Sequence, residues 1–179
     1  MTTESLFMVG ALVVAGIGSV TDVTTRRIPN KLTYFAILVA LVGRFALQGW
    51  SGLGNSIAGG LIGGGAFLIF FLVHAMGAGD VKLITAVGCF AGATPAVEIV
   101  LASTIAGGIF AVIVALRQGR LRAVFANMLD LIKFHAIAGT EAHPSLNLSN
   151  PQAARLPYGV AIAAGVLYSV LAFYRRGGI

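Results

Sequence analysis

The sequence predicts an all-α integral membrane protein, built as one bundle of about six transmembrane helices. Hydrophobic residues make up 58% of the 179 residues, charged residues make up only 10%, and the mean hydropathy is +0.93. This usage is far from that of a soluble domain. The chain also contains several charge-free apolar runs, and a bilayer core about 30 Å thick needs roughly 20 apolar residues of helix to cross it. We therefore expect residues 1–179 to form a single domain embedded in the lipid bilayer.

Six apolar runs are the candidate spans. The expected helices are Ser5–Thr21, Leu32–Leu47, Leu53–Met76, Val81–Ala96, Ile99–Leu116 and Pro157–Tyr174. The first run differs from a signal peptide because no basic segment precedes it and Glu4 stands in that place. The uncharged stretch from Phe45 to Gly79 is too long for one ordinary span, and the residues from Gly49 to Asn55 offer a break.

The basic residues predict the orientation of the bundle. With six spans and the N-terminus outside, the inner loops hold Arg26, Arg27, Lys31, Lys82, Arg117, Arg120, Arg122, Lys133 and Arg155. Only Arg44, Arg175 and Arg176 remain outside, and the terminal pair argues weakly against this orientation. Because cytoplasmic loops carry an excess of Lys and Arg, we expect these inner loops to be cytosolic.

Residues 117–156 form the one long hydrophilic connection, which we expect to be a cytosolic loop between the fifth and sixth spans. Its first half places apolar residues at helical spacing opposite polar ones, which predicts an amphipathic helix. The apolar set is Leu121, Val124, Phe125, Met128 and Ile132, and the polar set is Arg122, Asn127, Asp130 and Lys133. Two interpretations remain open: a helix lying on the inner leaflet, or a solvated helix packed on the bundle.

Composition also excludes several function classes. The net charge of +6 is spread between hydrophobic segments and forms no continuous patch, so no nucleic-acid partner is expected. Cys89 is the single cysteine, which excludes a disulfide within the chain and a zinc site built from cysteines. His135 and His143 do not form a convincing metal spacing. We therefore expect neither a metal nor another cofactor.

Glycines recur at a spacing of four in the third expected helix. Gly59 and Gly63 form one pair, and Gly60 and Gly64 form a second. Small residues one turn apart allow helices to approach closely. The alternative is a flexible or unwinding segment near a substrate path.

Two of the six carboxylates stand apart from the others. Glu4, Glu98, Asp130 and Glu141 all have simple solvent-facing explanations. Asp22 and Asp80 instead lie at the boundary of an apolar run, on the same expected cytosolic side, where an ionisable group must face water or the bundle interior. The topology thus predicts two carboxylates at one membrane depth. The plainer alternative is an ion pair of Asp22 with Arg26, four residues on, and of Asp80 with the nearby Lys82.

The residues around both aspartates narrow the choice. Gly77-Ala78-Gly79-Asp80 places two glycines before a carboxylate, and glycine permits close backbone approach and a positive φ. A plain interhelical turn would have the same appearance. Asp22 begins a polar, basic segment that ends at Pro29, and Asn30 is a plausible cap for the next helix.

Taken together, these motifs resemble the type IV prepilin peptidases, bacterial GxGD aspartic proteases, and in particular their short CpaA/TadV-type branch. The resemblance is carried by Asp22 with Arg27-Ile28-Pro29-Asn30, by Gly77-Ala78-Gly79-Asp80-Val81-Lys82-Leu83, and by Leu156-Pro157-Tyr158-Gly159-Val160-Ala161. It implies that the chain cleaves leader peptides from Flp-type prepilins and pilin-like proteins at the cytosolic face of the bacterial inner membrane. Larger relatives also methylate the new N-terminus and carry a cysteine cluster, so methyltransferase activity is not expected here.

The resemblance assigns catalysis to Asp22 and Asp80, with Gly77 and Gly79 as supporting motif residues. Two close carboxylates cannot both ionise cheaply, so we expect them to share a proton, one acting as base and one as acid. Arg27 and Lys82 are candidates for substrate contact, and His74 is a candidate for tuning the site. Two rival hypotheses are a small proton or cation transporter subunit and a non-catalytic membrane scaffold.

Overall fold

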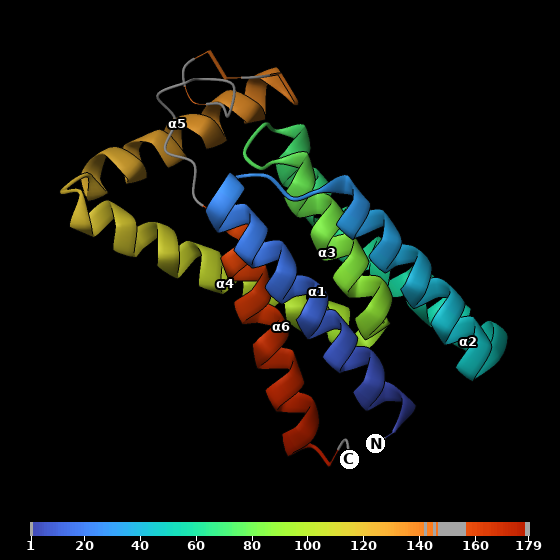
Figure 1. The fold of residues 1–179 in the computed structure, drawn as a ribbon. Helices are drawn as coiled ribbons and strands as arrows, with labels where there is room; N and C mark the ends of the chain where they lie inside the picture. The colour runs from blue at the N-terminus through green and yellow to red at the C-terminus, as the bar shows by residue number, and fades with distance from the viewer. Residues whose placement is uncertain (1, 142, 145, 147–156, 178–179) are drawn as a thin grey trace.

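The computed structural model describes residues 2–141, 143–144, 146 and 157–177, and this part of the chain is all-helical (Figure 1). Its helices are α1 (Thr3–Thr25), α2 (Asn30–Leu72), α3 (Ala78–Ala91), α4 (Ala93–Arg117), α5 (Leu121–Ala138) and α6 (Tyr158–Arg175). The all-α class is thereby confirmed. Residues 142, 145 and 147–156 of the expected cytosolic loop, Arg155 and Leu156 among them, lie outside the described residues.

The second and third expected spans are two arms of α2, which reverses direction at Gly49. Gly49 has φ 65° and ψ −152°, a conformation outside the helical region and in the range that favours glycine. The first arm leads away from the α1–α2 connection, and the second arm returns beside α3 (Figure 1). The break expected between Gly49 and Asn55 is therefore confirmed at its first residue.

Glycines allow the second arm of α2 to lie directly against α3. Gly59 faces the backbone of Gly88, and a Cβ added to Gly63 would lie 2.7 Å from the carbonyl oxygen of Ile84. Gly59, Gly60, Gly63 and Gly64 are all buried inside a continuous helical arm. This observation favours the packing interpretation over an unwinding segment.

The expected boundary between the fourth and fifth spans is wrong by several residues. We expected a helix over Val81–Ala96, whereas α3 ends at Ala91 and α4 begins at Ala93. Gly92 causes the break with φ 85°. The side-chain oxygen of Asn55, on α2, then accepts a 2.9 Å hydrogen bond from the backbone N–H of Ala93 and caps α4 from another helix.

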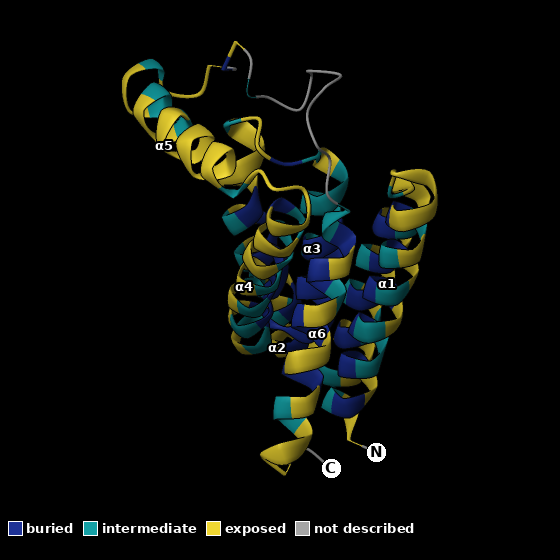
Figure 2. Ribbon diagram, turned by 90° about the vertical axis from the view of Figure 1, so that its left-hand side faces the viewer, coloured by how far each residue is buried: buried dark blue, intermediate teal, exposed yellow. Residues whose placement is uncertain are grey.

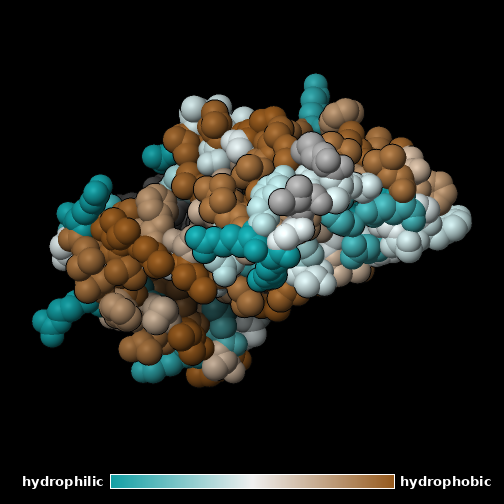
Figure 3. All heavy atoms as spheres, turned by 90° about the horizontal axis from the view of Figure 1, so that it is seen from below, coloured by the Kyte–Doolittle hydropathy of each residue, from teal (hydrophilic) through white to brown (hydrophobic). Residues whose placement is uncertain are grey.

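Four of the described helices are long and apolar enough to cross a membrane, namely α1, α2, α4 and α6. The two arms of α2 raise the possible number of crossings to five, and α3, at 14 residues, is about 21 Å long, shorter than the bilayer core. A count of six therefore stays a prediction. Large hydrophobic side chains are exposed along these membrane-length helices, as expected for helices that face lipid. Figure 3 shows hydrophobic and hydrophilic side chains together on the end where both termini lie.

Arg44, counted from the sequence on the outer side and within the expected helix Leu32–Leu47, is fully buried in the first arm of α2. The sequence did not predict this burial. The Arg44 guanidinium donates to both carboxylate oxygens of Glu4 at 3.1 and 3.2 Å and to the carbonyl oxygens of Phe90 and Ala91. The last two carbonyls belong to the final turn of α3, which has no intrahelical donors for them. Glu4 and Arg44 thus join the ends of three helices.

The buried residues gather where α1, α3 and α6 meet the two arms of α2 (Figure 2). Small residues on α1 admit large ones from α3: a Cβ on Gly10 would lie 2.7 Å from the Phe90 ring, and a Cβ on Gly18 would lie 2.6 Å from a Leu83 methyl group. Since the later residue of α1 meets the earlier residue of α3, the two helices are antiparallel. The end of α1 therefore lies beside the beginning of α3.

Candidate active site

The packing register of α1 and α3 brings Asp22 and Asp80 to the same end of the bundle. Gly18 packs on Leu83, and Asp22 lies four residues beyond Gly18 while Asp80 lies three residues before Leu83. Both steps are about one helical turn in the same direction along the antiparallel pair. The two carboxylates interact electrostatically, since the charge on Asp22 is one of the causes that shift the titration of Asp80. The expected convergence of the two residues is therefore found in the fold.

Asp22 is held by the beginning of α6. The residue is 9% exposed, and its Oδ2 accepts a 2.8 Å buried hydrogen bond from the backbone N–H of Gly159, the second residue of α6. A Cβ on Gly159 would lie 3.0 Å from Cβ of Asp22 and 3.1 Å from its Oδ2. The first N–H groups of a helix lack intrahelical partners and carry a partial positive charge, so this contact favours a negative Asp22.

Asp80 also lies at the beginning of a helix, but burial dominates its electrostatic environment. It lies in the first turn of α3, before the apolar run that begins at Val81. Burial, the largest cause, and the neighbouring charge of Asp22 together raise the pKa of Asp80 from 3.8 to about 7, against a smaller lowering by a hydrogen bond with the Gly77 backbone. At neutral pH about half of the Asp80 carboxyl groups therefore hold a proton.

The two motif glycines provide space rather than an unusual backbone. Gly77 has φ −78° and caps α3, so the positive φ considered from the sequence is not adopted there. A Cβ on Gly77 would lie 3.2 Å from Oδ2 of Asp80, and a Cβ on Gly79 would lie 3.3 Å from Cβ of Ile28. Because Gly77 has no side chain, the carboxylate of Asp80 can lie against the backbone that precedes it. Because Gly79 has no side chain, Ile28 of the α1–α2 connection can approach the start of α3.

The alternative ion pairs are not formed in the described part of the chain. Among its salt bridges none joins Asp22 to Arg26 or Asp80 to Lys82. Lys82 instead donates a 3.0 Å hydrogen bond to Oδ1 of Asn30 and lies 5.3 Å from the centre of the Tyr34 ring, which ties α3 to the start of α2. Arg26 and Arg27 are exposed in the connection that follows α1.

His74 lies in the turn between α2 and α3, where its φ is 56° and its side chain is exposed. It therefore belongs to the connection that leads into Gly77, at the same end of the bundle as the two aspartates. The structure assigns this ring no role in the carboxylate pair, and its tuning effect stays a prediction.

Tyr158 is a further residue of this region, and the sequence interpretation gave it no role. It precedes Gly159 in α6, its hydroxyl donates to the carbonyl oxygen of Ser103 at 3.3 Å, and it interacts electrostatically with Asp80. The ring packs on Gly107, where a Cβ would lie 2.5 Å from it, and on Phe67. Tyr158 thus fastens α6 to α4 beside the carboxylates. The sequence signal that could have identified Tyr158 was its place between Pro157 and Gly159 at the start of a helix.

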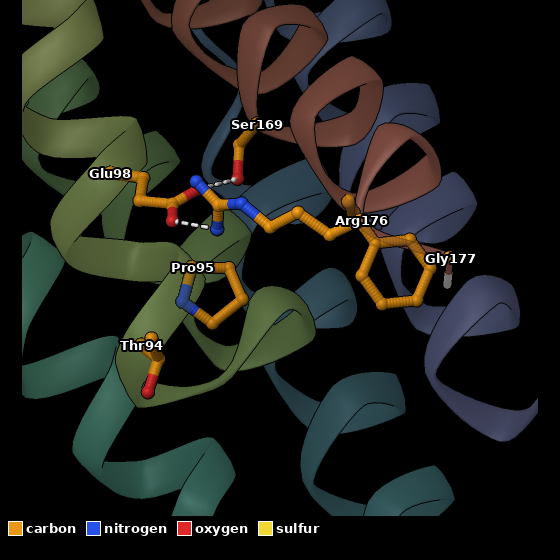
Figure 4. A pocket seen from close by; sticks show the side chains of 7 residues that line it. Thr94, Pro95, Glu98, Ser169, Arg176 and Gly177 are labelled. Atoms are coloured by element: carbon orange, nitrogen blue, oxygen red, sulfur yellow. Dashed lines mark hydrogen bonds and ion pairs between the residues drawn. The ribbon is translucent and has the colours of Figure 1, made fainter.

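A hollow of about 300 Å³ lies at the other end of the bundle (Figure 4). It is lined by Thr94, Pro95, Glu98, Ser169, Phe173, Arg176 and Gly177. Glu98 accepts hydrogen bonds from Arg176 and Ser169, so the polar groups of the hollow satisfy one another. Glu98 lies within α4 rather than in an outer turn. In the described residues no group of three potential metal ligands comes together.

The comparison with protein families gives one match. Residues 6–112 match the type IV leader peptidase family. The matched range includes both Asp22 and Asp80, and it ends before the α6 segment that contacts Asp22. No curated protein and no solved structure matches the chain. Because the match covers more than half of the chain, this protein belongs to the type IV leader peptidase family.

Proposed function

We propose that this peptidase is an aspartic endopeptidase that cleaves the leader from type IV, Flp-type prepilins. The observation that carries the proposal is the pairing of Asp22 and Asp80 at one end of the bundle, where the two carboxylates differ in environment. Family membership supports the peptidase activity and a pilin substrate. The Flp-type substrate rests on the resemblance of the three motifs to the short branch.

The different environments assign a role to each carboxylate. Asp22, held by the N–H of Gly159, is the ionised base that takes a proton from water as the oxygen attacks the scissile carbonyl carbon. Asp80 is the neutral acid that donates a hydrogen bond to the carbonyl oxygen and stabilises the developing negative charge. When the C–N bond breaks, a proton held by the pair passes to the leaving amine. This scheme requires no metal and no organic cofactor.

The site is proposed to lie at the cytosolic face of the inner membrane. The end of the bundle that carries Asp22 and Asp80 also carries Arg26, Arg27, Lys31 and Lys82, which supports a cytosolic location and an outer N-terminus. A prepilin's hydrophobic helix would lie against the bundle while its leader stays in the cytosol. Arg27 is better placed than Lys82 to contact an acidic substrate residue, because Lys82 already bonds Asn30.

Reconstitution with candidate prepilins in liposomes tests the proposal. Leader loss is read by gel shift, and N-terminal sequencing and mass measurement of the product show the cleaved bond and any added methyl group. We expect Asp22→Asn and Asp80→Asn each to abolish cleavage. Asp130→Asn is the matched control, because Asp130 is an exposed aspartate of α5 that pairs only with His143 among the described residues.

Near-normal cleavage by either Asp22→Asn or Asp80→Asn would show that the pair is not the catalytic dyad. Arg27→Glu tests the substrate contact separately. We expect this variant to raise KM while kcat is retained, and an unchanged KM would exclude Arg27 from substrate binding.

A further inference from the structure

Helix α5 extends away from the bundle and is the one described helix without a buried residue. It begins four residues after Arg117, where α4, a candidate membrane span, ends. Among the described helices only α4 comes close to it, and α5 runs crosswise to α1 and α3 (Figure 1). Because a helix that follows a span directly starts at the membrane surface, this direction is that of a helix lying along the surface rather than crossing it.

The two sides of α5 differ in what covers them. One side carries Asp130 and Phe134, and His143 folds back on it: His143 Nε2 lies 3.4 Å from Asp130, and the rings of Phe134 and His143 are 4.7 Å apart. The opposite side is apolar and is covered by no other described part of the chain. Its members are Val124, Phe125, Met128, Leu129 and Ile132, each between 41% and 59% exposed.

Basic side chains border this apolar side. At 100° per residue, Arg122 and Lys133 lie about 20–40° beyond Leu129 at the edge of the apolar arc, and Arg117 and Arg120 precede the helix. All four are exposed. Long basic side chains beside a buried apolar strip extend to the level of lipid headgroups. The charge of the border is complementary to anionic headgroups.

We propose that α5 is a membrane-surface helix, with Phe125, Met128, Leu129 and Ile132 inserted into the same leaflet that the ends of α1 and α4 reach, and with Arg122 and Lys133 bound to anionic lipid headgroups. The occupant of the apolar face is lipid, not a second protein. This proposal stands independently of the catalytic assignment.

Site-directed fluorescence on the full chain tests the proposal. In a Cys89→Ala background, Met128→Cys and Asn127→Cys are labelled with the same environment-sensitive dye in nanodiscs of phosphatidylcholine and phosphatidylglycerol. These neighbours project about 100° apart on the helix. We expect blue-shifted emission and strong quenching by doxyl lipids at position 128, and solvent-like, weakly quenched emission at position 127. Because Cys89 is buried, we expect the dye not to label it. The two cysteine variants can therefore also be made with Cys89 retained, as a check on the Cys89→Ala substitution.

Neutralising the border tests the headgroup contact. We expect Arg122→Gln and Lys133→Gln each to lower the equilibrium constant for insertion of α5 by about fivefold on anionic lipid. Neither variant should have an effect in phosphatidylcholine alone. Equal, unquenched emission at positions 127 and 128 would overturn the proposal in favour of a solvated helix. Quenching at position 128 that requires an added prepilin would overturn the proposal in favour of a substrate-binding surface. Quenching that does not depend on lipid charge would exclude the contact with anionic headgroups.

Discussion

The backbone N–H of Gly159 donates a 2.8 Å hydrogen bond to Oδ2 of Asp22, across 137 residues of sequence. This contact joins the end of α1 to the beginning of α6, and it orients one carboxylate before any substrate is bound. The two carboxylates are also unequal, because burial and the neighbouring charge of Asp22 raise the pKa of Asp80 to about 7. A dyad that must contain one base and one acid needs such an inequality.

The first prediction concerns the space at Gly159. Gly159→Ala keeps the N–H but places a Cβ 3.0 Å from Cβ of Asp22 and 3.2 Å from Cα of Ser19, so α1 and α6 must shift by a few tenths of an ångström. Since displacement of a catalytic group by about 1 Å costs on the order of a hundredfold, we expect kcat to fall by about tenfold.

The control for this variant is Gly16→Ala, since Gly16 lies on α1 near Asp22 and has no neighbouring atom within 4 Å of an added Cβ. We expect wild-type kcat for it. If Gly159→Ala shows the same kinetics as Gly16→Ala, the hydrogen bond does not position the base.

The second prediction concerns the proton on Asp80. Because the pKa of Asp80 is about 7 in the folded protein against 3.8 ordinarily, the folded chain holds a proton between about pH 4 and 7 that the unfolded chain releases. The free energy of unfolding should therefore fall as pH rises through this window. Cleavage should decline above about pH 7, as the acid is lost.

A carbodiimide that reacts with protonated carboxyl groups measures this proton directly. Mass spectrometry should show labelling of Asp80 with a midpoint near pH 7. In Asp22→Asn the midpoint should move down, because the neighbouring charge is gone, yet stay above 3.8, because burial is the larger cause. A midpoint that does not move would mean that Asp22 and Asp80 are not coupled.

Local sequence predicted the parts of this structure that depend on periodicity and on single residues. Apolar runs located the helices, and Gly49 and the two edge aspartates were evident before any contact was known. The Gly159–Asp22 bond was not predictable in this way, because it depends on how α6 docks on α1. Pro157 and Gly159 marked the start of a helix, but its orphan N–H groups did not identify their acceptor.

The burial of Arg44 was not recognised from the sequence. An arginine within an apolar run must face the protein interior and find a partner, and Gln48, one turn later, accepts a 2.9 Å hydrogen bond from it. Arg44 was counted only as a basic residue of the outer side, and this signal was not used. Gly92 was a similar case, because no charged residue lies between Lys82 and Glu98 to mark a break, while the backbone of Gly92 ends a helix.

The third prediction concerns the contact between α2 and α3. Gly63→Val would place its Cβ 2.7 Å from the backbone oxygen of Ile84, whereas Gly65 on the same arm has open space at its Cβ position. Because backbone atoms cannot move aside as a side chain can, we expect Gly63→Val to separate the two helices and to lower the free energy of unfolding by about 1–3 kcal/mol. Gly65→Val is the control with the same β-branched side chain. Equal thermal stability of the two variants in detergent would contradict close packing at Gly63.

The fourth prediction compares two ion pairs at the end of the bundle opposite the aspartates. Glu4→Gln leaves the fully buried Arg44 without its carboxylate, a change that costs about 3–5 kcal/mol in a dry interior. Because the Glu4 side chain is 44% exposed, water replaces part of the lost interaction, and we expect about 1–3 kcal/mol. Arg44→Lys should be no milder, since an ammonium group cannot reach Glu4 and two carbonyls of α3 in the geometry of the guanidinium fork.

Glu98→Gln provides the comparison, because its partner Arg176 is 65% exposed and surface pairs of this kind contribute about 0–1 kcal/mol. Denaturant-induced unfolding in one detergent should therefore rank Glu4→Gln and Arg44→Lys well below Glu98→Gln. Equal losses from Glu4→Gln and Glu98→Gln would mean that the Arg44 cluster does not hold the end of α3. Asp80 lies in the first turn of α3, at the opposite end of this short helix from the Arg44 contacts. We therefore expect Glu4→Gln and Arg44→Lys to lower cleavage only at temperatures where these variants begin to unfold.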